Sequence, residues 1–141
     1  MFKIYEKYLI KKFIEKFLLV TLIFLSLSII LGVFEEISFF KDADANFFLP
    51  YLMTLLNAPI TLFEIFPFIF LLTSQFFFIH LIDNDEINTF KNNGLSNIKL
   101  IYIVSILSFI CGLIIITFFY NFSAILQFKY LDIKKNFTND N

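Results

Sequence analysis

Residues 17–34 read FLLVTLIFLSLSIILGVF, and none of these side chains is charged. Residues 65–82 and residues 100–128 are also free of charge. An uncharged run of about 18 residues or more can cross the ~30 Å hydrocarbon core of a membrane as a helix. Lipid offers no hydrogen-bond partner to bare backbone groups, so each run is expected to be helical. The sequence therefore predicts an all-α membrane protein with three transmembrane helices.

The composition favours this class and argues against several others. The chain has 141 residues, of which 59% are hydrophobic and 23 are Phe, with a net charge of −1. Soluble domains have about 45–50% apolar residues. A membrane β-barrel would need segments of about ten residues that alternate apolar and polar, and none is present. The first run is longer than the apolar region of a secretory signal, and no A-x-A-type cleavage site follows it.

The residues that carry chemistry are few. No Gly-rich phosphate loop, nucleophile motif or nucleic-acid signature is present. His80 is the only histidine and Cys111 the only cysteine, so no metal spacing and no disulfide framework exists. Glu35 and Glu36 are adjacent, and adjacent helix positions point about 100° apart, so they do not form an acid–base pair. We therefore expect a protein that is not an enzyme and that binds no cofactor, metal or nucleic acid.

The lysines predict the orientation, because positive charge in short flanking segments stays cytoplasmic. With the N-terminus inside, the inner segments hold seven lysines and the outer segments four. The expected order is a cytoplasmic amphipathic segment (1–13), a transmembrane helix (14–38), an outer loop with an interfacial part (39–58), a second transmembrane helix (59–82), a cytoplasmic loop (83–96), a third transmembrane helix (97–127) and an outer tail (128–141).

Two of these boundaries depend on local signals. The second transmembrane helix is expected to begin near Pro59, because proline disrupts helix interiors and biases the preceding residue away from the α conformation. In the tail, residues 129–135 alternate polar and apolar, a pattern that could open a β-strand. Residues 42–46 are expected to form a polar turn on the outer side.

The cytoplasmic loop, residues 83–96, reads DNDEINTFKNNGLS and has more structural signals than a simple turn needs. Asp83 can cap a helix, and Glu86 three residues later completes a capping box. Asp85 and Glu86 also lie where the helix dipole favours negative charge. These signals predict the start of a short helix at the inner surface of the membrane.

The rest of the loop predicts where this helix faces and where it ends. Ile87 and Phe90 are spaced i, i+3 on one face. Gly94 is suited to a helix stop, and Ser96 can cap the next helix. Two interpretations stay open: a turn with a solvated acidic face, or a helix that presents Glu86 to an arginine of a soluble partner.

Glu64 is the only acid among residues 47–82. An acid inside a membrane helix costs a few kcal/mol and is a functional candidate by default. If the second helix begins near Pro59, Glu64 lies about one turn from the outer boundary, where it can reach water. It is then either a contact for a substrate or partner, or an interfacial acid.

At the loop the sequence resembles the LptF/LptG (YjgP/YjgQ) family of lipopolysaccharide export permeases. The resemblance covers essentially the whole chain. It rests on the order and spacing of the following motifs: Tyr5…Tyr8-Leu9-Ile10-Lys11-Lys12-Phe13, similar to the family's opening R-Y-I-x-K-x-F run; Pro59…Phe66-Pro67; Asp85-Glu86-Ile87; and Glu86-x7-Gly94-Leu95-Ser96.

The resemblance implies a function: an inner-membrane permease subunit of an ABC-type exporter that extracts lipopolysaccharide and passes it towards the outer membrane. It implies a homologous permease subunit and a cytoplasmic ATPase dimer as partners, with lipopolysaccharide or a related lipid as cargo. The loop would be the coupling helix, and the implied ATPase-coupling residues are Asp85, Glu86, Ile87, Phe90 and Gly94. A path for the lipid is expected along the first helix, and the candidate residues are Phe34, Glu35, Glu36 and Glu64.

The chain also departs from the family pattern. Family members have six membrane helices with a periplasmic jellyroll between the third and fourth, and we expect the jellyroll and the last three helices to be absent here. Residues 31–34 read LGVF where one branch of the family often has a basic residue, which weakens a lipid-phosphate contact there. The alternative function is therefore a three-helix membrane scaffold or a truncated fragment that transports nothing.

Overall fold

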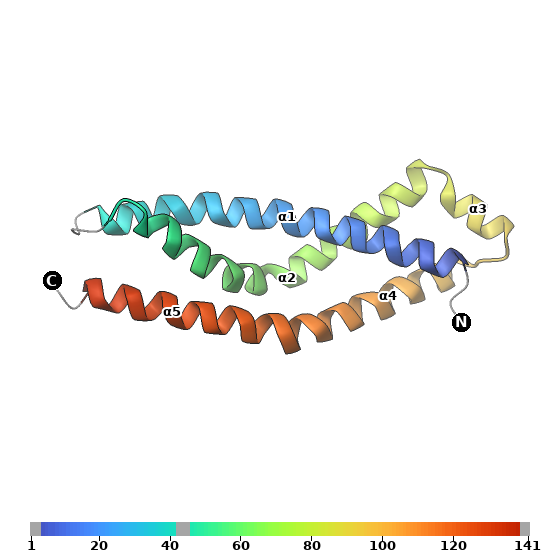
Figure 1. Cartoon of the computed structure of the whole chain (residues 1–141). Coiled ribbons are helices and arrows are strands. Elements are labelled where there is room, and N and C mark those ends of the chain that lie inside the picture. The colour runs from blue at the N-terminus through green and yellow to red at the C-terminus, as the bar shows by residue number, and fades with distance from the viewer. Residues whose placement is uncertain (1–3, 42–45, 139–141) are drawn as a thin grey trace. The chain divides into compact units, whose positions relative to one another are not determined.

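A computed structural model describes residues 4–41 and 46–138 of the chain (Figure 1). Within these residues the chain is helical and has no β-strand. Residues 42–45 of the expected outer turn lie outside the described residues. The same holds for residues 1–3 of the N-terminal segment and residues 139–141 of the tail. The helices are α1 (Ile4–Phe40), α2 (Leu49–Asp83), α3 (Glu86–Asn92), α4 (Asn97–Ile114), a π-helical segment η1 (Ile115–Phe119) and α5 (Tyr120–Thr138).

Three of these helices are long and apolar enough to cross a membrane: Ile4–Phe40, Leu49–Asp83 and the continuous stretch Asn97–Thr138. They contain 37, 35 and 42 residues. At a rise of about 1.5 Å per residue each exceeds 50 Å, which is longer than a ~30 Å hydrocarbon core. The helix ends therefore reach beyond the hydrocarbon, and the predicted all-α fold with three spanning helices is confirmed.

The first helix starts earlier than the expected transmembrane segment, because α1 is continuous from Ile4. The lysine-rich start is the first part of this helix. Its charged side chains stabilise the helix: Lys11 Nζ and Lys12 Nζ lie 3.9 and 3.4 Å from the carboxylate of Glu15. Pairs at i, i+4 and i, i+3 spacing favour helix, and no proline interrupts the segment.

The second helix also starts earlier than expected, at Leu49 rather than near Pro59. Pro50 lies in the first turn of α2, where backbone N–H groups have no acceptor within the helix, so the N–H that proline lacks costs no hydrogen bond. Pro59 and Pro67 are both inside α2, each at the loss of one backbone hydrogen bond. Interior prolines are tolerated in membrane helices because the remaining backbone groups keep their partners within the helix. Most of the expected interfacial segment is thus helical.

The tail is helical where its alternation suggested a strand. Tyr130, Ile133 and Phe137 recur at helical spacing, and all three pack around Phe40 and Met53. This 3.6-residue periodicity, not the two-residue alternation, describes the side that is buried. The tail continues as α5 to Thr138, and in this helix its apolar side chains contact the core of unit 2.

The chain divides into two compact units, residues Met1–Thr21 with Pro67–Ile114 (unit 1) and residues Leu22–Phe66 with Ile115–Asn141 (unit 2). The core of unit 1 joins α1, α2, the α3–α4 turn and α4, and consists of Leu9, Phe13, Phe77, Leu81, Leu95, Leu100 and Val104. In unit 2, α1 and α2 approach closely at Gly32. A Cβ atom added there would lie 2.8 Å from Cγ2 of Thr54.

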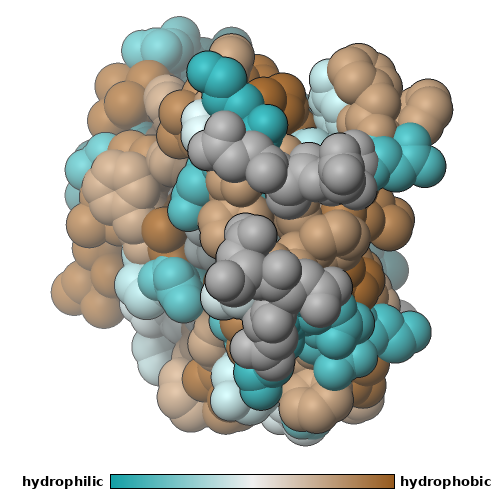
Figure 2. All heavy atoms as spheres, turned by 90° about the vertical axis from the view of Figure 1, so that its left-hand side faces the viewer, coloured by the Kyte–Doolittle hydropathy of each residue, from teal (hydrophilic) through white to brown (hydrophobic). Residues whose placement is uncertain are grey.

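Many large apolar side chains point outward on all three long helices, including Leu31 at 68% exposure and Phe109 at 69%. In the view of Figure 2, hydrophobic side chains cover much of the surface. Soluble proteins rarely expose contiguous apolar patches of this extent. The exposed faces are suited to lipid or to neighbouring membrane helices.

Candidate functional site

The loop between the second and third spanning helices forms a short helix, α3, with well-defined ends (Figure 1). At its C-terminal end Gly94 has a φ of 82°, a conformation that favours glycine. The Gly94 N–H donates to the carbonyl of Lys91 and the Leu95 N–H to the carbonyl of Phe90, both at 2.9 Å. This is a Schellman motif, accompanied here by the burial of Leu95. The predicted helix stop at Gly94 is confirmed.

The start of α3 differs from the predicted capping box. Asp83 is the last residue of α2, so its backbone is helical and its side chain does not cap α3. Asp85 occupies the N-cap position in a left-handed conformation, with a φ of 56° and no side-chain cap hydrogen bond. Its carboxylate instead accepts from the Asn88 amide at 2.6 Å. At the other side of the loop, Ser96 caps α4 as predicted, with its Oγ 3.4 Å from the Lys99 N–H.

Glu86, in the first turn of α3, has partners within unit 1 that the sequence did not reveal. The Tyr8 hydroxyl donates to Glu86 Oε1 at 2.6 Å, and His80 Nε2 lies 3.8 Å from the same oxygen. Tyr8 lies in the lysine-rich start of α1, before the uncharged run. The hydrogen bond to Glu86 raises the pKa of Tyr8 to about 12, so its hydroxyl stays protonated at physiological pH. The second oxygen, Oε2, is buried and has no hydrogen-bond partner among the described residues.

The predicted apolar face of α3 is turned towards its own chain. Ile87 and Phe90 are half-buried and pack against the core of unit 1. Phe90 lies 6.2 Å from the ring of Tyr8, measured between centroids. The exposed side of α3 is polar instead and consists of Asn88, Thr89, Lys91 and Asn92. Any partner that docks on α3 as it stands meets this polar side and the exposed edges of the two apolar side chains.

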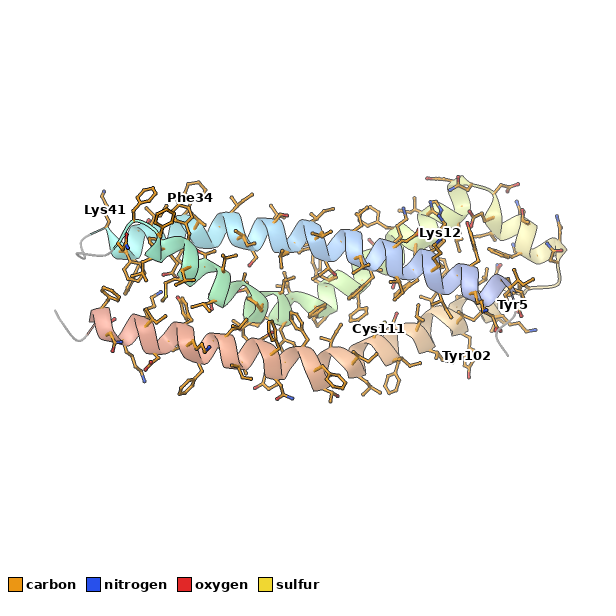
Figure 3. All side chains as sticks on the ribbon, viewed as in Figure 1. Tyr5, Lys12, Phe34, Lys41, Tyr102 and Cys111 are labelled. Carbon is orange, nitrogen blue, oxygen red and sulfur yellow. The ribbon has the colours of Figure 1, made fainter. Side chains whose placement is uncertain are left out.

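The candidate lipid-path residues at the end of α1 separate into exposed and buried positions in unit 2. Phe34 is 68% exposed, and its side chain points away from the helices (Figure 3). Glu35 is exposed, whereas the next residue, Glu36, is only 2% exposed. The two carboxylates therefore face different surroundings, and only Phe34 and Glu35 present an open surface.

Glu36 is held by two residues of α5. The Tyr130 hydroxyl donates to Glu36 Oε1 at 2.6 Å, and Lys134 Nζ lies 3.1 and 3.4 Å from the two carboxylate oxygens. Lys134 also lies 4.3 Å from the ring centre of Phe39, a cation–π contact. A buried charge with an opposite charge and a hydrogen bond is a structural pair. Glu36 thus joins α1 to α5, and only a search beyond the local sequence could find its partners.

Glu35 and Glu36 also border a small cavity between α1 and α2 in unit 2. Its walls include the polar side chains of Ser28, Asn57 and Thr61, and its volume is about 120 Å³. A water molecule needs about 10–15 Å³ of such space, so the cavity has room for several waters.

Glu64 lies much deeper in its helix than the sequence suggested. Because α2 begins at Leu49, Glu64 is 15 residues along it, or about four turns rather than one. Its side chain is exposed on unit 2. A charge that faces lipid in the middle of a spanning helix costs a few kcal/mol, so Glu64 stays a candidate for contact with a polar neighbour.

Metal ligands do not gather in the part of the chain that the structure describes. No group of three or more His, Cys, Asp or Glu side chains is close enough to hold an ion there. The pair of His80 and Glu86 has only two candidate ligands, and Tyr8 already occupies the carboxylate.

Three helices of spanning length, with a short helix between the second and third, define a multi-pass membrane protein. The family model described as lipopolysaccharide export system permease LptF/LptG matches residues 7–141, which is most of the chain. The chain therefore belongs to the LptF/LptG family, and its role at family level is that of a lipopolysaccharide export permease in the inner membrane. No match was found among curated proteins or among solved structures.

Proposed function

We propose that the chain is a permease subunit of an ABC-type exporter that extracts lipopolysaccharide from the inner membrane and passes it towards the outer membrane. A homologous permease subunit and a cytoplasmic ATPase dimer are its partners. The N-terminus, α3 and the start of α4 lie on the cytoplasmic side, in agreement with the excess of lysines there. The observation that carries the proposal is α3: a discrete helix with a Schellman stop, placed between two spanning helices.

In this proposal α3 is the coupling helix that docks on the ATPase. Asp85 and Glu86 supply negative charge at its start, which attracts a basic side chain of the ATPase, and Asp85 is exposed there. The polar side of α3 meets the ATPase surface, and the exposed edges of Ile87 and Phe90 complete the contact. Gly94 allows the sharp turn that returns the chain to the membrane. Movement of α3 upon ATP binding then changes the conformation of the permease.

The lipid is proposed to pass along the outer parts of α1 and α2. Phe34 offers apolar area to acyl chains, and Glu35 lies beside it on the surface. Glu64 contacts either the lipid or the partner permease, because its exposed position in α2 needs a polar neighbour. Glu36 belongs to this region as a structural residue, since its carboxylate is already paired with Lys134.

A photo-crosslinking experiment on the assembled complex tests the coupling contact. A photoreactive amino acid at Lys91, exposed on α3, should crosslink to the ATPase. Lys135 is the matched control: it is an exposed lysine in the last turn of α5, on the proposed periplasmic side, and should give no ATPase adduct. Assembly of the complex without a crosslink from Lys91 would contradict the proposal.

A further inference from the structure

A hydrogen bond within unit 1 joins the first turns of α1 to α3. The Tyr8 hydroxyl donates to Glu86 Oε1 at 2.6 Å across 78 residues of sequence. Hydrogen bonds from a hydroxyl to an ionised carboxylate are about 2.5–2.7 Å long and roughly twice as strong as neutral ones. The hydrogen bond between Tyr8 and Glu86 is thus a strong one, and it holds Glu86, the residue proposed to contact the ATPase.

The surroundings of Tyr8 hold its side chain in place. Its ring is tilted against that of Phe90, with centroids 6.2 Å apart. The next residue, Leu9, is 1% exposed and packs in the core of unit 1 with Leu81 and Leu95. Leu81 and Leu95 flank α3 in the sequence, so the backbone on both sides of the hydrogen bond is held by the same core.

The helix α3 needs contacts of this kind to keep its position. It has seven residues, and none of them is fully buried. An isolated helix of fewer than about 12 residues is marginal in water, so its stability comes from tertiary contacts. The Schellman turn and Leu95 fix its C-terminal end. At its N-terminal end, the hydrogen bond from Tyr8 to Glu86 has the corresponding role.

We propose that Tyr8 is a positioning residue that holds Glu86, and with it α3, against α1. A displacement of α3 by a partner is then passed directly to α1, which continues as one unbroken helix from Ile4 to Phe40. This inference rests on the proposed coupling function of α3 and adds the element that receives the movement. His80 is the secondary contact, because its 3.8 Å separation from Glu86 Oε1 is longer than a hydrogen bond.

Hydrogen exchange on the membrane-embedded permease pair tests the positioning, before any ATPase is added. Tyr8→Phe removes only the hydroxyl and keeps the ring against Phe90, so the fold is retained. We expect the amides of α3 to exchange about tenfold faster in Tyr8→Phe. The matched control is Tyr102→Phe, since Tyr102 lies on α4 in the same unit and is 64% exposed (Figure 3). Unchanged exchange of α3 in Tyr8→Phe would overturn the inference.

The complex with the ATPase tests the transmission to α1. In reconstituted vesicles, Tyr8→Phe should hydrolyse ATP within about twofold of the unsubstituted complex, while the amount of lipopolysaccharide extracted per ATP falls about tenfold. A residue that only stabilised the fold would lower both rates together. Equal extraction per ATP in Tyr8→Phe and Tyr102→Phe would therefore overturn the inference.

The two measurements also separate this inference from the proposed function. If a crosslinker on α3 never reaches the ATPase, the proposed coupling is wrong whatever Tyr8 does. Faster exchange of α3 in Tyr8→Phe still supports the anchoring in that case, because it is measured without the ATPase. If the crosslink forms and exchange is unchanged, the coupling stands and the role of Tyr8 is refuted.

Discussion

The buried ion pair between Glu36 and Lys134 allows a sharp test of how unit 2 is held together. The side chain of Glu36 is 3% exposed and that of Lys134 is 22% exposed, with Nζ 3.1 Å from Oε1. Lys134→Met keeps most of the length of the side chain, one heavy atom shorter, and removes its charge. The carboxylate then retains the hydrogen bond from Tyr130 but no opposite charge, and breaking a buried pair in this way costs about 3–5 kcal/mol.

Substitution of Glu36, the other partner of the pair, should destabilise the protein less than Lys134→Met. In Glu36→Gln the amide oxygen still accepts from Tyr130, and the partly exposed Lys134 can keep its charge solvated. We expect a loss of about 1–3 kcal/mol, typical of one altered buried hydrogen bond. The double variant leaves no buried charge, and replacing a buried pair with neutral groups is often close to neutral in stability. It should lie within about 1 kcal/mol of the unsubstituted protein, well below the sum of the single changes.

Reversible unfolding by a denaturing detergent in mixed micelles measures these differences. Cys111 is the only cysteine and is half-buried, so its labelling by a thiol reagent reports unfolding alongside the loss of helical circular dichroism. Lys135→Met is the matched control, an exposed lysine next to Lys134 whose loss should change stability by less than about 0.5 kcal/mol. If the costs of Glu36→Gln and Lys134→Met simply add in the double variant, the pairing that we describe is refuted.

Three further predictions follow from backbone geometry and titration. Gly32→Ala should destabilise the protein by about 1–3 kcal/mol, because the added methyl group meets the buried Thr54; Gly112→Ala, with nothing within 4 Å of the new atom, should be neutral or stabilising in the same unfolding assay. Gly94→Ala forces a residue with a side chain into the left-handed backbone conformation, at a cost of about 1–2 kcal/mol. Amides at the end of α3 should therefore exchange roughly tenfold faster, and no change would contradict the Schellman geometry. The hydrogen bond to Glu86 raises the pKa of Tyr8 to about 12 from its ordinary 10.0. The contribution of this bond to stability is therefore complete below pH 10 and is lost as the pH rises towards 12. In a titration followed by phenolate absorbance, Tyr8→Phe should lack the ionisation step near pH 12, and an unchanged curve would argue against the bond.

The candidate site was only partly predictable from the sequence. The position of α3, its stop at Gly94 and the cap at Ser96 are local features, and the structure has all three. The start was mistaken, because a capping box at Asp83 and a helix that continues through Asp83 have the same sequence pattern. The packing of Phe90 against the core of unit 1 was not predictable either, since a face of two apolar residues can cover a partner or its own core with equal ease. Its contact with an ATPase stays a prediction.

The sequence by itself determined the class of this protein. Uncharged runs longer than the hydrocarbon core must be helical in lipid, because backbone groups there have no other partner, and this depends only on local composition. The tertiary structure alone decided which carboxylates are available. Glu86 bonds with Tyr8 and Glu36 pairs with Lys134, across 78 and 98 residues, whereas Glu35 and Glu64 remain exposed. Such pairings depend on which helix faces pack together. Helical periodicity in the sequence identifies the apolar face of each helix, but it does not identify the helix against which that face packs.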